Sequence, residues 1–390
     1  MDENLKNKKI ETRAVHTGRV PEDGTGSVTT PIFPSSTYRV AFPGDESGYV
    51  YSRWSNPTRN AVERALASLE SGSKAYLFSS GLSALNAIMS LFRAGDHIVA
   101  VDDLYGGTIR QFEKIWTKFG MEFSYVDGTN PENFQKAIKP NTKLFWIETP
   151  TNPLMKLIDI EEVSKIARPK DILVAVDNTF ATPYIQRPLE LGADLVHHSA
   201  SKYLSGHCDI IAGAVVVKDE KLAEKVFFNQ YAIGGHLNPF EAWLLLRGLK
   251  TLHVRMERHS VNAMKVSEYL ETVDIVDKIY FPGHDGRPIP NKMAMPGGMI
   301  SFTMNADFET VKAFVMATEV FILAESLGGV ESLINHPASM THASIPREVR
   351  EKRGISDSLV RLSVGIENID DLLIDLRKAF EAIRVRVKKA

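Results

Sequence analysis

The chain has 390 residues, of which 44% are hydrophobic and 24% are charged, as in an ordinary globular protein long enough for two domains. Its 46 Lys and Arg residues nearly balance its 48 Asp and Glu residues, so the net charge is only -2. This balance provides neither a basic field for nucleic acid nor a polybasic segment for a membrane surface, and small molecules are the expected partners.

The sequence also indicates the compartment. Cys208 is the only cysteine, so no intrachain disulfide can form, which fits a reducing environment. Residues 1–9 are polar and rich in lysine, with no apolar segment behind them, and no uninterrupted apolar run approaches the length of a membrane span. We therefore expect a cytoplasmic protein.

In chain order, the first 57 residues are rich in proline and glycine and are expected to form an extended arm that lies on another surface. A helical period of apolar residues begins at Thr58 and ends before Gly72. Strand and helix patterns then alternate at 75–78, 82–92, 97–101, 109–119, 144–147, 160–167 and 172–176. Such alternation predicts an α/β fold with a mostly parallel sheet covered by helices.

The second half of the chain continues with a different arrangement. It predicts a strand at 211–217, a long helical region at 238–269, two strands at 299–304 and 359–364, and a closing helix at 370–385. These later strands indicate a smaller α/β domain. The expected division is an extended N-terminal arm at 1–57, a large domain at 58–245 and a small C-terminal domain at 246–390.

A carboxylate and a lysine follow successive predicted strands. The apolar run 172–176 ends at Asp177, as in a buried strand that delivers one charged group at its carboxyl end. Lys202 follows 25 residues later between Ser201 and Tyr203. Taken singly, a strand-end aspartate such as Asp177 is more often a helix cap, and a lysine such as Lys202 is more often a surface charge. Together they predict a pyridoxal 5'-phosphate (PLP) site, since a pyridinium nitrogen needs a carboxylate and an aldehyde needs an amine.

Other polar and small residues fall at the ends of predicted strands. The amides of Gly81 and Leu82 open a predicted helix and are able to face a phosphate, although the same segment also suits a plain N-cap turn. Tyr105 is placed to stack on a planar cofactor, with glycines behind it that also suit an ordinary turn. Asn152 follows another strand and is able to hydrogen-bond a phenolic oxygen.

The sequence lacks the motifs of dinucleotide-binding, Walker-type and zinc enzymes. No Gly-x-Gly-x-x-Gly sequence follows a strand, and there is no Walker loop and no His-Glu-x-x-His helix. His197 and His198 are adjacent and would point to opposite faces of a strand, which suits core packing better than a metal. We therefore expect no metal site.

A set of short motifs runs along nearly the whole chain. They are Tyr51-Ser52-Arg53 with Asn56-Pro57-Thr58-Arg59, Ser80-Gly81, Tyr105-Gly106-Gly107-Thr108, Glu148-Thr149-Pro150-Thr151-Asn152-Pro153, Val176-Asp177-Asn178-Thr179, Ser199-Ala200-Ser201-Lys202-Tyr203 and Arg361-Leu362-Ser363-Val364-Gly365. In order and spacing this set resembles the Cys/Met-metabolism (trans-sulfuration) family of PLP-dependent enzymes. The resemblance implies a PLP-dependent transferase fold like that of aspartate aminotransferase (fold type I), in homotetramers whose subunits share active sites.

The resemblance also implies a role for each matching residue. Lys202 would hold PLP and move protons, Asp177 would pair with the ring nitrogen, and Tyr105 would stack on the ring and protonate a leaving sulfur. The implied phosphate contacts are Gly81, Leu82, Ser199 and Ser201, with Tyr51 and Arg53 from a neighbouring subunit. The implied substrate contacts are Asn152 and Arg361 at the α-carboxylate, with Ser326, Glu325 and Arg110. Asn152 would also touch the cofactor. Ser201 stands where the family often has threonine.

Within the family the chain looks most like cystathionine γ-lyases and γ-synthases, which implies γ-elimination of cystathionine to cysteine, 2-oxobutanoate and ammonia. The pattern after Ser326 resembles these groups, because Leu327 stands where β-lyases commonly have an aromatic residue. The alternatives are cystathionine γ-synthase, O-acetylhomoserine sulfhydrylase and methionine γ-lyase, the last less favoured because it typically has cysteine at the position of Gly107. A non-catalytic PLP-binding protein is disfavoured, since it would not need Arg361, Asn152 and Tyr105.

Overall fold

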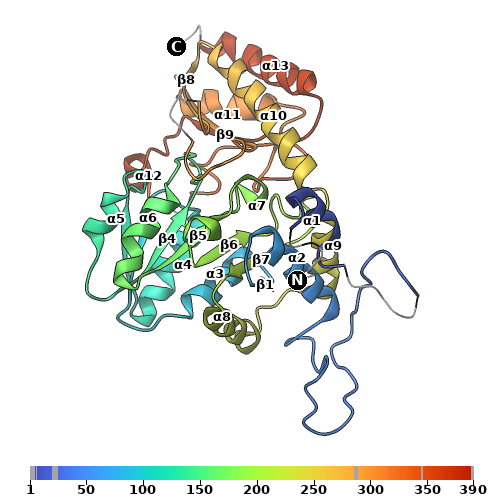
Figure 1. The fold of residues 1–390 in the computed structure, drawn as a ribbon. Coiled ribbons are helices and arrows are strands. Elements are labelled where there is room, and N and C mark those ends of the chain that lie inside the picture. Colours follow the sequence, from blue (N-terminus) through green and yellow to red (C-terminus); the bar gives the residue numbers. More distant parts are fainter. Residues whose placement is uncertain (1–4, 6, 20–24, 285–288, 344–345, 388–390) are drawn as a thin grey trace.

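Two β-sheets organise the computed structural model, which describes residues 5, 7–19, 25–284, 289–343 and 346–387 (Figure 1). The larger sheet has seven strands in the order β1-β7-β6-β5-β4-β2-β3. Its strands are β1 (Lys74–Phe78), β2 (His97–Val101), β3 (Glu122–Val126), β4 (Thr142–Glu148), β5 (Leu173–Asp177), β6 (Leu195–Ser199) and β7 (Gly213–Val217). All neighbours from β3 to β6 are parallel, while β7 runs antiparallel between β6 and β1. The predicted α/β fold with a mostly parallel sheet is confirmed.

The smaller sheet lies in the C-terminal part of the chain, which forms the upper part of the view in Figure 1. It has five strands in the order β10-β11-β12-β9-β8. They are β8 (Val276–Tyr280), β9 (Met299–Met304), β10 (Ile322–Leu323), β11 (Leu333–Asn335) and β12 (Leu359–Ser363). This sheet has its own apolar core, formed with α10 (Leu252–Glu271), α11 (Phe308–Ala317) and α13 (Ile369–Val387).

The helices of the larger sheet cover both of its faces. They are α2 (Pro57–Leu69), α3 (Gly81–Met89), α4 (Gly106–Lys114), α5 (Glu132–Ala137), α6 (Ile160–Ala167), α7 (Thr182–Ile185), α8 (Glu220–Ile233) and α9 (Pro239–Leu249). One core cluster lies with α3, α4 and α6, and a second with α2 and α9. Because both faces are covered, the central strands are buried and read as continuous apolar runs.

The register of three neighbouring strands fixes where the site forms. Glu148 at the end of β4 pairs with Asp177 at the end of β5, and Asp177 pairs with His197 in β6. The carboxyl ends of parallel strands meet at one edge of a sheet, where open α/β sheets bind ligands. Residues distant in sequence are thereby brought side by side.

Several elements differ from the sequence expectation. The helix expected at 109–119 ends at Lys114 and is followed by a 3-10 helix at Trp116–Phe119. The helical region expected at 238–269 is divided at Thr251 into α9 and α10. The strand β3 and the helices α5 and α8 were not predicted. β3 lies at the sheet edge with half-exposed side chains, and α8 leaves Phe228 and Ile233 exposed, so neither shows a clear apolar period.

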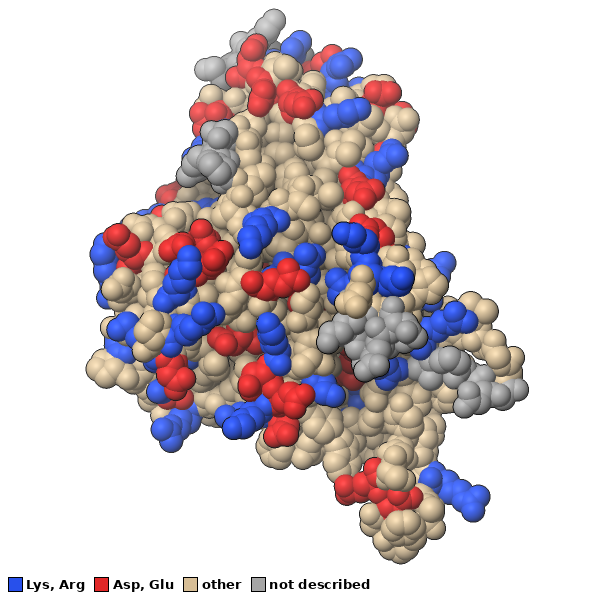
Figure 2. Space-filling view, viewed as in Figure 1, with Lys and Arg blue, Asp and Glu red and all other residues tan. Residues whose placement is uncertain are grey.

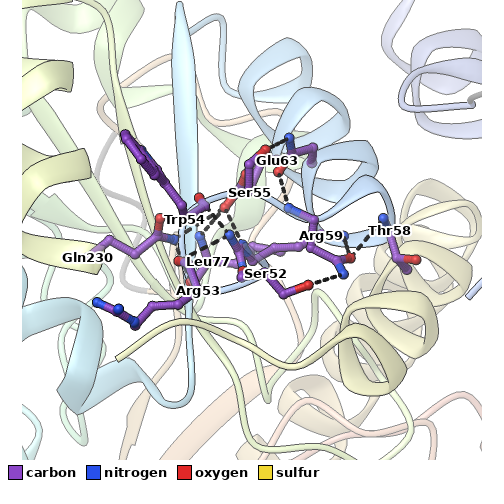
Figure 3. A network of polar contacts seen from close by, with 11 residues as sticks. Ser52, Arg53, Trp54, Ser55, Thr58, Arg59, Glu63, Leu77 and Gln230 are labelled. Carbon is purple, nitrogen blue, oxygen red and sulfur yellow. Dashed lines mark hydrogen bonds and ion pairs between the residues drawn. The ribbon is translucent and has the colours of Figure 1, made fainter. Parts of the chain in front are cut away.

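The N-terminal arm is only partly extended. A short helix, α1 (Ile10–His16), buries Ala14, which the expectation of an extended arm missed. Described residues 25–56 form no helix or named strand, and this segment leaves the body at the lower right of Figure 1. Residues 1–4, 6 and 20–24 of the expected arm lie outside the described residues. The base of the arm is held by buried Arg59, which donates to the carbonyls of Ser52 at 2.7 Å and Trp54 at 2.9 Å (Figure 3).

The boundary expected at residue 245 falls inside α9, which packs against α2 beside the larger sheet. The next helix, α10, contributes Ala263, Val266 and Leu270 to the core of the smaller sheet. We therefore propose that the chain passes from the large to the small domain between α9 and α10.

The surface agrees with the balanced composition. Acidic and basic side chains are interspersed over the face shown in Figure 2. Among the helices within the described ranges, none has the length and apolar character needed to cross a bilayer.

Candidate active site

Lys202 lies in the turn that follows β6, where its backbone N–H donates to the Ser199 carbonyl at 3.2 Å. Its Nζ donates to Ser326 Oγ at 2.6 Å. Burial, and then the positive charge of nearby Arg361, lower the pKa of the Lys202 amine to about 8. A much larger fraction of this amine is therefore neutral near pH 7 than in an ordinary lysine, as a nucleophile or base requires.

Asp177 is a buried carboxylate at the end of β5. Its Oδ2 lies 3.0 Å from His197 Nδ1, and its Oδ1 accepts from the Thr179 N–H at 3.0 Å and from the Thr179 hydroxyl. Burial alone would raise the pKa of Asp177, but the His197 charge and these hydrogen bonds hold it below its ordinary value. Asp177 in turn raises the pKa of His197, against the effect of burial. The carboxylate is thus kept ionised.

A second carboxylate, Glu148, lies beside Asp177 at the end of β4. Burial and then the Asp177 charge raise the pKa of Glu148 well above its ordinary value. Two adjacent buried carboxylates cannot both be charged at low cost, so the negative charge of Asp177 opposes ionisation of Glu148. Glu148 Oε2 also accepts the Tyr105 N–H at 3.0 Å and so fixes the start of α4.

The Tyr105 side chain is 41% exposed at this edge of the sheet. Gly107 leaves room for its ring, because a Cβ at Gly107 would lie 2.3 Å from Tyr105 Cε1. A side chain at position 107 would therefore displace the Tyr105 ring from its place in the structure.

The expected phosphate contacts gather at the start of α3. Ser80 caps this helix by accepting the Ser83 N–H at 3.0 Å, so the alternative reading as an N-cap is confirmed. The cap leaves the amides of Gly81 and Leu82 without an acceptor inside the helix, which is the arrangement that binds anions. A Cβ at Gly81 would lie 3.0 Å from Ser199 Cβ, so the helix start lies directly against Ser199.

Ser201 is placed differently. Its Oγ donates to the Ala212 carbonyl at 3.2 Å and accepts the Ala212 N–H at 2.9 Å. The hydroxyl hydrogen must turn away from Ala212 before Ser201 is able to donate to a phosphate.

Arg361, on β12, is buried and joins the substrate side of the site. Its Nη1 donates to Asn152 Oδ1 at 2.6 Å and its Nη2 to the Ser326 carbonyl at 3.3 Å. The remaining Nε is buried without a hydrogen-bond partner among the described residues. Burial lowers the pKa of Arg361 to about 10, so the guanidinium stays charged at neutral pH. An anion bound beside the Arg361 guanidinium would balance its buried positive charge and accept its unused N–H groups.

Four further predicted site residues are exposed. They include Arg110 and Glu325, and Glu325 is close enough for its charge to oppose the lowering by burial of the pKa values of Lys202 and Arg361. Tyr51 and Arg53 are also exposed, and Arg53 donates to the Tyr231 carbonyl at 3.1 Å while its guanidinium lies 5.5 Å from the Tyr51 ring centre. Within the described part of this single chain, neither arm residue has a hydrogen bond or ion pair with Gly81, Ser199 or Lys202.

The partners that tune the site were not predicted from the sequence. Glu148 and Thr179 had no expected role, and His197 was expected only to pack in the core. His197 is indeed buried, but it also faces Asp177. The available signal was the alternation of side chains along β6, and using it required the register between β5 and β6.

The chemistry of these residues fits PLP. A buried ionised carboxylate suits a ring nitrogen, an amine of lowered pKa suits an aldehyde, and a glycine at a helix start beside Ser199 suits a phosphate. Within the described residues, no group of three or more His, Cys, Asp and Glu side chains is arranged to hold a metal ion.

Comparison with known proteins gives the family. A family model described as Cys/Met metabolism PLP-dependent enzyme matches residues 11–381. The chain belongs to this family. It is 51% identical to a cystathionine β-lyase of Lactococcus lactis over 95% of this chain and 99% of the relative. It is 48% identical to a cystathionine γ-lyase of Bacillus subtilis over 96% of this chain and 100% of the relative.

A solved structure agrees with these relatives. The crystal structure of cystathionine γ-lyase from Lactobacillus plantarum complexed with L-serine has a TM-score of 0.94 and 47% identity, and covers 97% of this chain and 100% of the other. The expected fold of PLP-dependent cystathionine lyases is thereby confirmed. The protein is a PLP-dependent carbon–sulfur lyase.

The lowered pKa of Lys202 gives a testable prediction. After removal of PLP, the rate of cofactor rebinding should rise with pH through a midpoint near 8, because only the neutral amine attacks the aldehyde. Arg361→Gln removes a positive charge and should move this midpoint upward, whereas Arg361→Lys keeps the charge and should leave it nearly unchanged. Stopped-flow absorbance over pH 6–11 measures the midpoint. A midpoint near the ordinary lysine value of about 10.4 in the unsubstituted protein would contradict the assignment.

Proposed function

We propose that the protein cleaves cystathionine at its Cγ–S bond, so that cystathionine and water give cysteine, 2-oxobutanoate and ammonia. The segment after Ser326 supports this choice. Leu327 is packed into the core beside Tyr203, and Ser326 faces Lys202 with its hydroxyl and Arg361 with its carbonyl. The position where β-lyases commonly carry an aromatic ring therefore holds a buried aliphatic side chain.

Each residue of the site has its own role in the proposed reaction. When bound, PLP withdraws electrons from the α-carbon of an amino acid substrate. Asp177 keeps the ring nitrogen protonated, and Arg361 with Asn152 binds the α-carboxylate. The Lys202 amine would take the α-proton, pass it on to the bound cofactor so that the amine is neutral again, and then take a proton from the β-carbon, while the Tyr105 hydroxyl would protonate the departing sulfur. Gly81, Leu82, Ser199 and Ser201 bind the phosphate.

Cystathionine β-lyase is the second candidate. It is favoured by the 51% identity to the Lactococcus lactis enzyme of that name. Cleavage at the Cβ–S bond of the same substrate would give homocysteine, pyruvate and ammonia. Cystathionine γ-synthase and O-acetylhomoserine sulfhydrylase follow, because a Bacillus subtilis relative named for both γ-synthase and O-acetylhomoserine (thiol)-lyase is 46% identical. Methionine γ-lyase is least favoured, since the cysteine that it typically carries at position 107 would displace the Tyr105 ring.

Product analysis tests the proposal. The purified holoenzyme is incubated with cystathionine, and the 2-oxo acids and thiols are identified by mass spectrometry. We expect 2-oxobutanoate with cysteine in excess over pyruvate with homocysteine. A parallel incubation with O-acetylhomoserine and cysteine measures cystathionine formation. Dominant pyruvate would identify a β-lyase, and faster synthesis than cleavage would identify a γ-synthase.

Replacing Arg361 tests the carboxylate contact. Arg361→Lys keeps the charge but cannot form two parallel hydrogen bonds. The substrate should therefore lose about 1.5–3 kcal/mol of binding free energy, and kcat/KM for cystathionine should fall accordingly while PLP stays bound. Steady-state kinetics and the absorbance of the bound cofactor measure the two effects. The control is Arg350→Lys, at a buried arginine that pairs with Asp357 at 2.9 Å. Unchanged kcat and KM in Arg361→Lys would place the carboxylate elsewhere.

We further propose that the chain forms a homotetramer in which each site takes Tyr51 and Arg53 from a neighbouring subunit. The exposed position of both residues on the arm supports this, because within one chain Arg53 donates to the Tyr231 carbonyl of α8 and its guanidinium lies over the Tyr51 ring. Arg53 would add a charge-assisted hydrogen bond to the phosphate.

Subunit mixing tests the shared site. Arg53→Ala and Lys202→Ala should each be nearly inactive. A dimer with one subunit of each kind has one intact site, and half of randomly assorted dimers are of this kind, so about a quarter of full activity should return by symmetry. The two variants are refolded together with PLP and assayed against the same variants refolded separately. No recovery, despite mixed dimers seen by native mass spectrometry, would place Arg53 within its own site.

A further inference from the structure

Another buried carboxylate, that of Glu70, lies behind the site, on the opposite face of the larger sheet. Glu70 directly follows α2, and its side chain and that of His198 are both 0% exposed. Its Oε1 lies 2.6 Å from His198 Nε2 and accepts from Asn178 Nδ2 at 2.8 Å. One carboxylate oxygen therefore serves two neighbouring strands. None of these three residues belongs to the cofactor contacts or substrate contacts proposed above.

The two partners of Glu70 flank the residues of the site. Asn178 directly follows Asp177, and His198 directly precedes Ser199 in the segment that leads to Lys202. Because successive side chains of a strand point to opposite faces, Asp177 and His197 meet on the cofactor side while Asn178 and His198 meet Glu70 behind it. Side-chain contacts on both faces of the sheet therefore hold the ends of β5 and β6 together.

The same network reaches a third segment of the site. Asn178 Nδ2 also donates to the Gln186 carbonyl at 3.1 Å. Gln186 Nε2 donates to Asn178 Oδ1 at 2.9 Å and to the Thr149 carbonyl at 2.8 Å. Thr149 begins the segment that carries Asn152. Glu70 is thus connected to the strand ends that present Asp177, Lys202 and Asn152.

Stability alone is a poor reason for such a pair. Charged pairs removed from water are costly, and apolar residues of similar volume often replace them without loss. We propose that Glu70 is a positioning residue, which sets the spacing between Asp177 and Lys202 across the cofactor. The proposal rests on the roles proposed above for those two residues. Displacement of a reacting group by about 1 Å lowers the rate about 10²-fold, so a small shift of these strand ends is enough to matter.

Glu70→Gln tests the proposal, because it keeps the shape of the side chain but leaves a single acceptor oxygen, with an amide N–H donor in place of the other. We expect the PLP dissociation constant of the holoenzyme to rise and kcat to fall, each at least about tenfold, while KM for cystathionine changes less than about threefold. The pH at which the absorbance of the Lys202-bound cofactor changes should also shift, because the surroundings of the amine move. Equilibrium release of PLP on dilution, steady-state kinetics and a spectroscopic pH titration measure these effects.

The matched control is Asp375→Asn. Asp375 is 3% exposed, lies on α13 and accepts the backbone N–H groups of Glu319, Val320 and Phe321. This variant should lower the unfolding temperature but leave PLP affinity, kcat and the pH titration unchanged. If Glu70→Gln behaves in the same way as Asp375→Asn, Glu70 is only structural and the proposal is overturned.

Asn178→Ala keeps the proposal testable if Glu70→Gln does not fold. It removes the link between Glu70 and the end of β5 and leaves the His198 pair in place. It should weaken PLP binding and lower kcat in the same pattern, and unchanged values would overturn the proposal. PLP affinity and absorbance do not depend on which carbon–sulfur bond is cleaved. A different product from the unsubstituted enzyme would therefore change the proposed function without changing this result.

Discussion

The ion pair between Asp177 and His197 is the interaction on which the site depends. A lone buried carboxylate would tend to be protonated, and it would then lose its attraction for a positively charged ring nitrogen. His197 at 3.0 Å, together with two hydrogen bonds from Thr179, keeps Asp177 ionised in spite of burial. Burial and then the Asp177 charge raise the pKa of neighbouring Glu148, whose Oε2 accepts the Tyr105 N–H at the start of α4. The charge of Asp177 thus shifts the pKa values of both neighbours, His197 and Glu148.

The cationic side of the site follows the same logic. Arg361 is buried with only part of its hydrogen-bonding capacity used, and its charge helps to lower the pKa of Lys202. An arriving α-carboxylate would compensate this charge. With the proposed roles, a single guanidinium would connect substrate recognition with the protonation of the amine that takes the substrate proton. Arg361 lies on β12 of the smaller sheet and contacts Asn152, which follows β4 of the larger sheet, so the proposed chemistry would use residues from both sheets.

Much of this arrangement could be predicted from the sequence. The apolar run that ends at Asp177 and the small residues around Lys202 indicated the cofactor, because buried parallel strands and strand-end polar groups have a local signature. The positions of His197 and Glu148 could not be predicted in the same way. Their roles depend on which residues face each other across β4, β5 and β6, and register is a property of the assembled sheet. The helix α8 was missed for a related reason, since its exposed apolar residues mask the helical period.

The protonation of the cofactor ring reports directly on the charge of Asp177. PLP labelled with ¹⁵N in the ring is bound to the enzyme, and its nitrogen NMR signal is followed from pH 6 to pH 9. An ionised Asp177 held by His197 predicts a ring nitrogen that stays protonated over the whole range. Replacing His197 with Gln should bring deprotonation into that range. A ring nitrogen that is unprotonated at pH 7 in the unsubstituted enzyme would contradict the account.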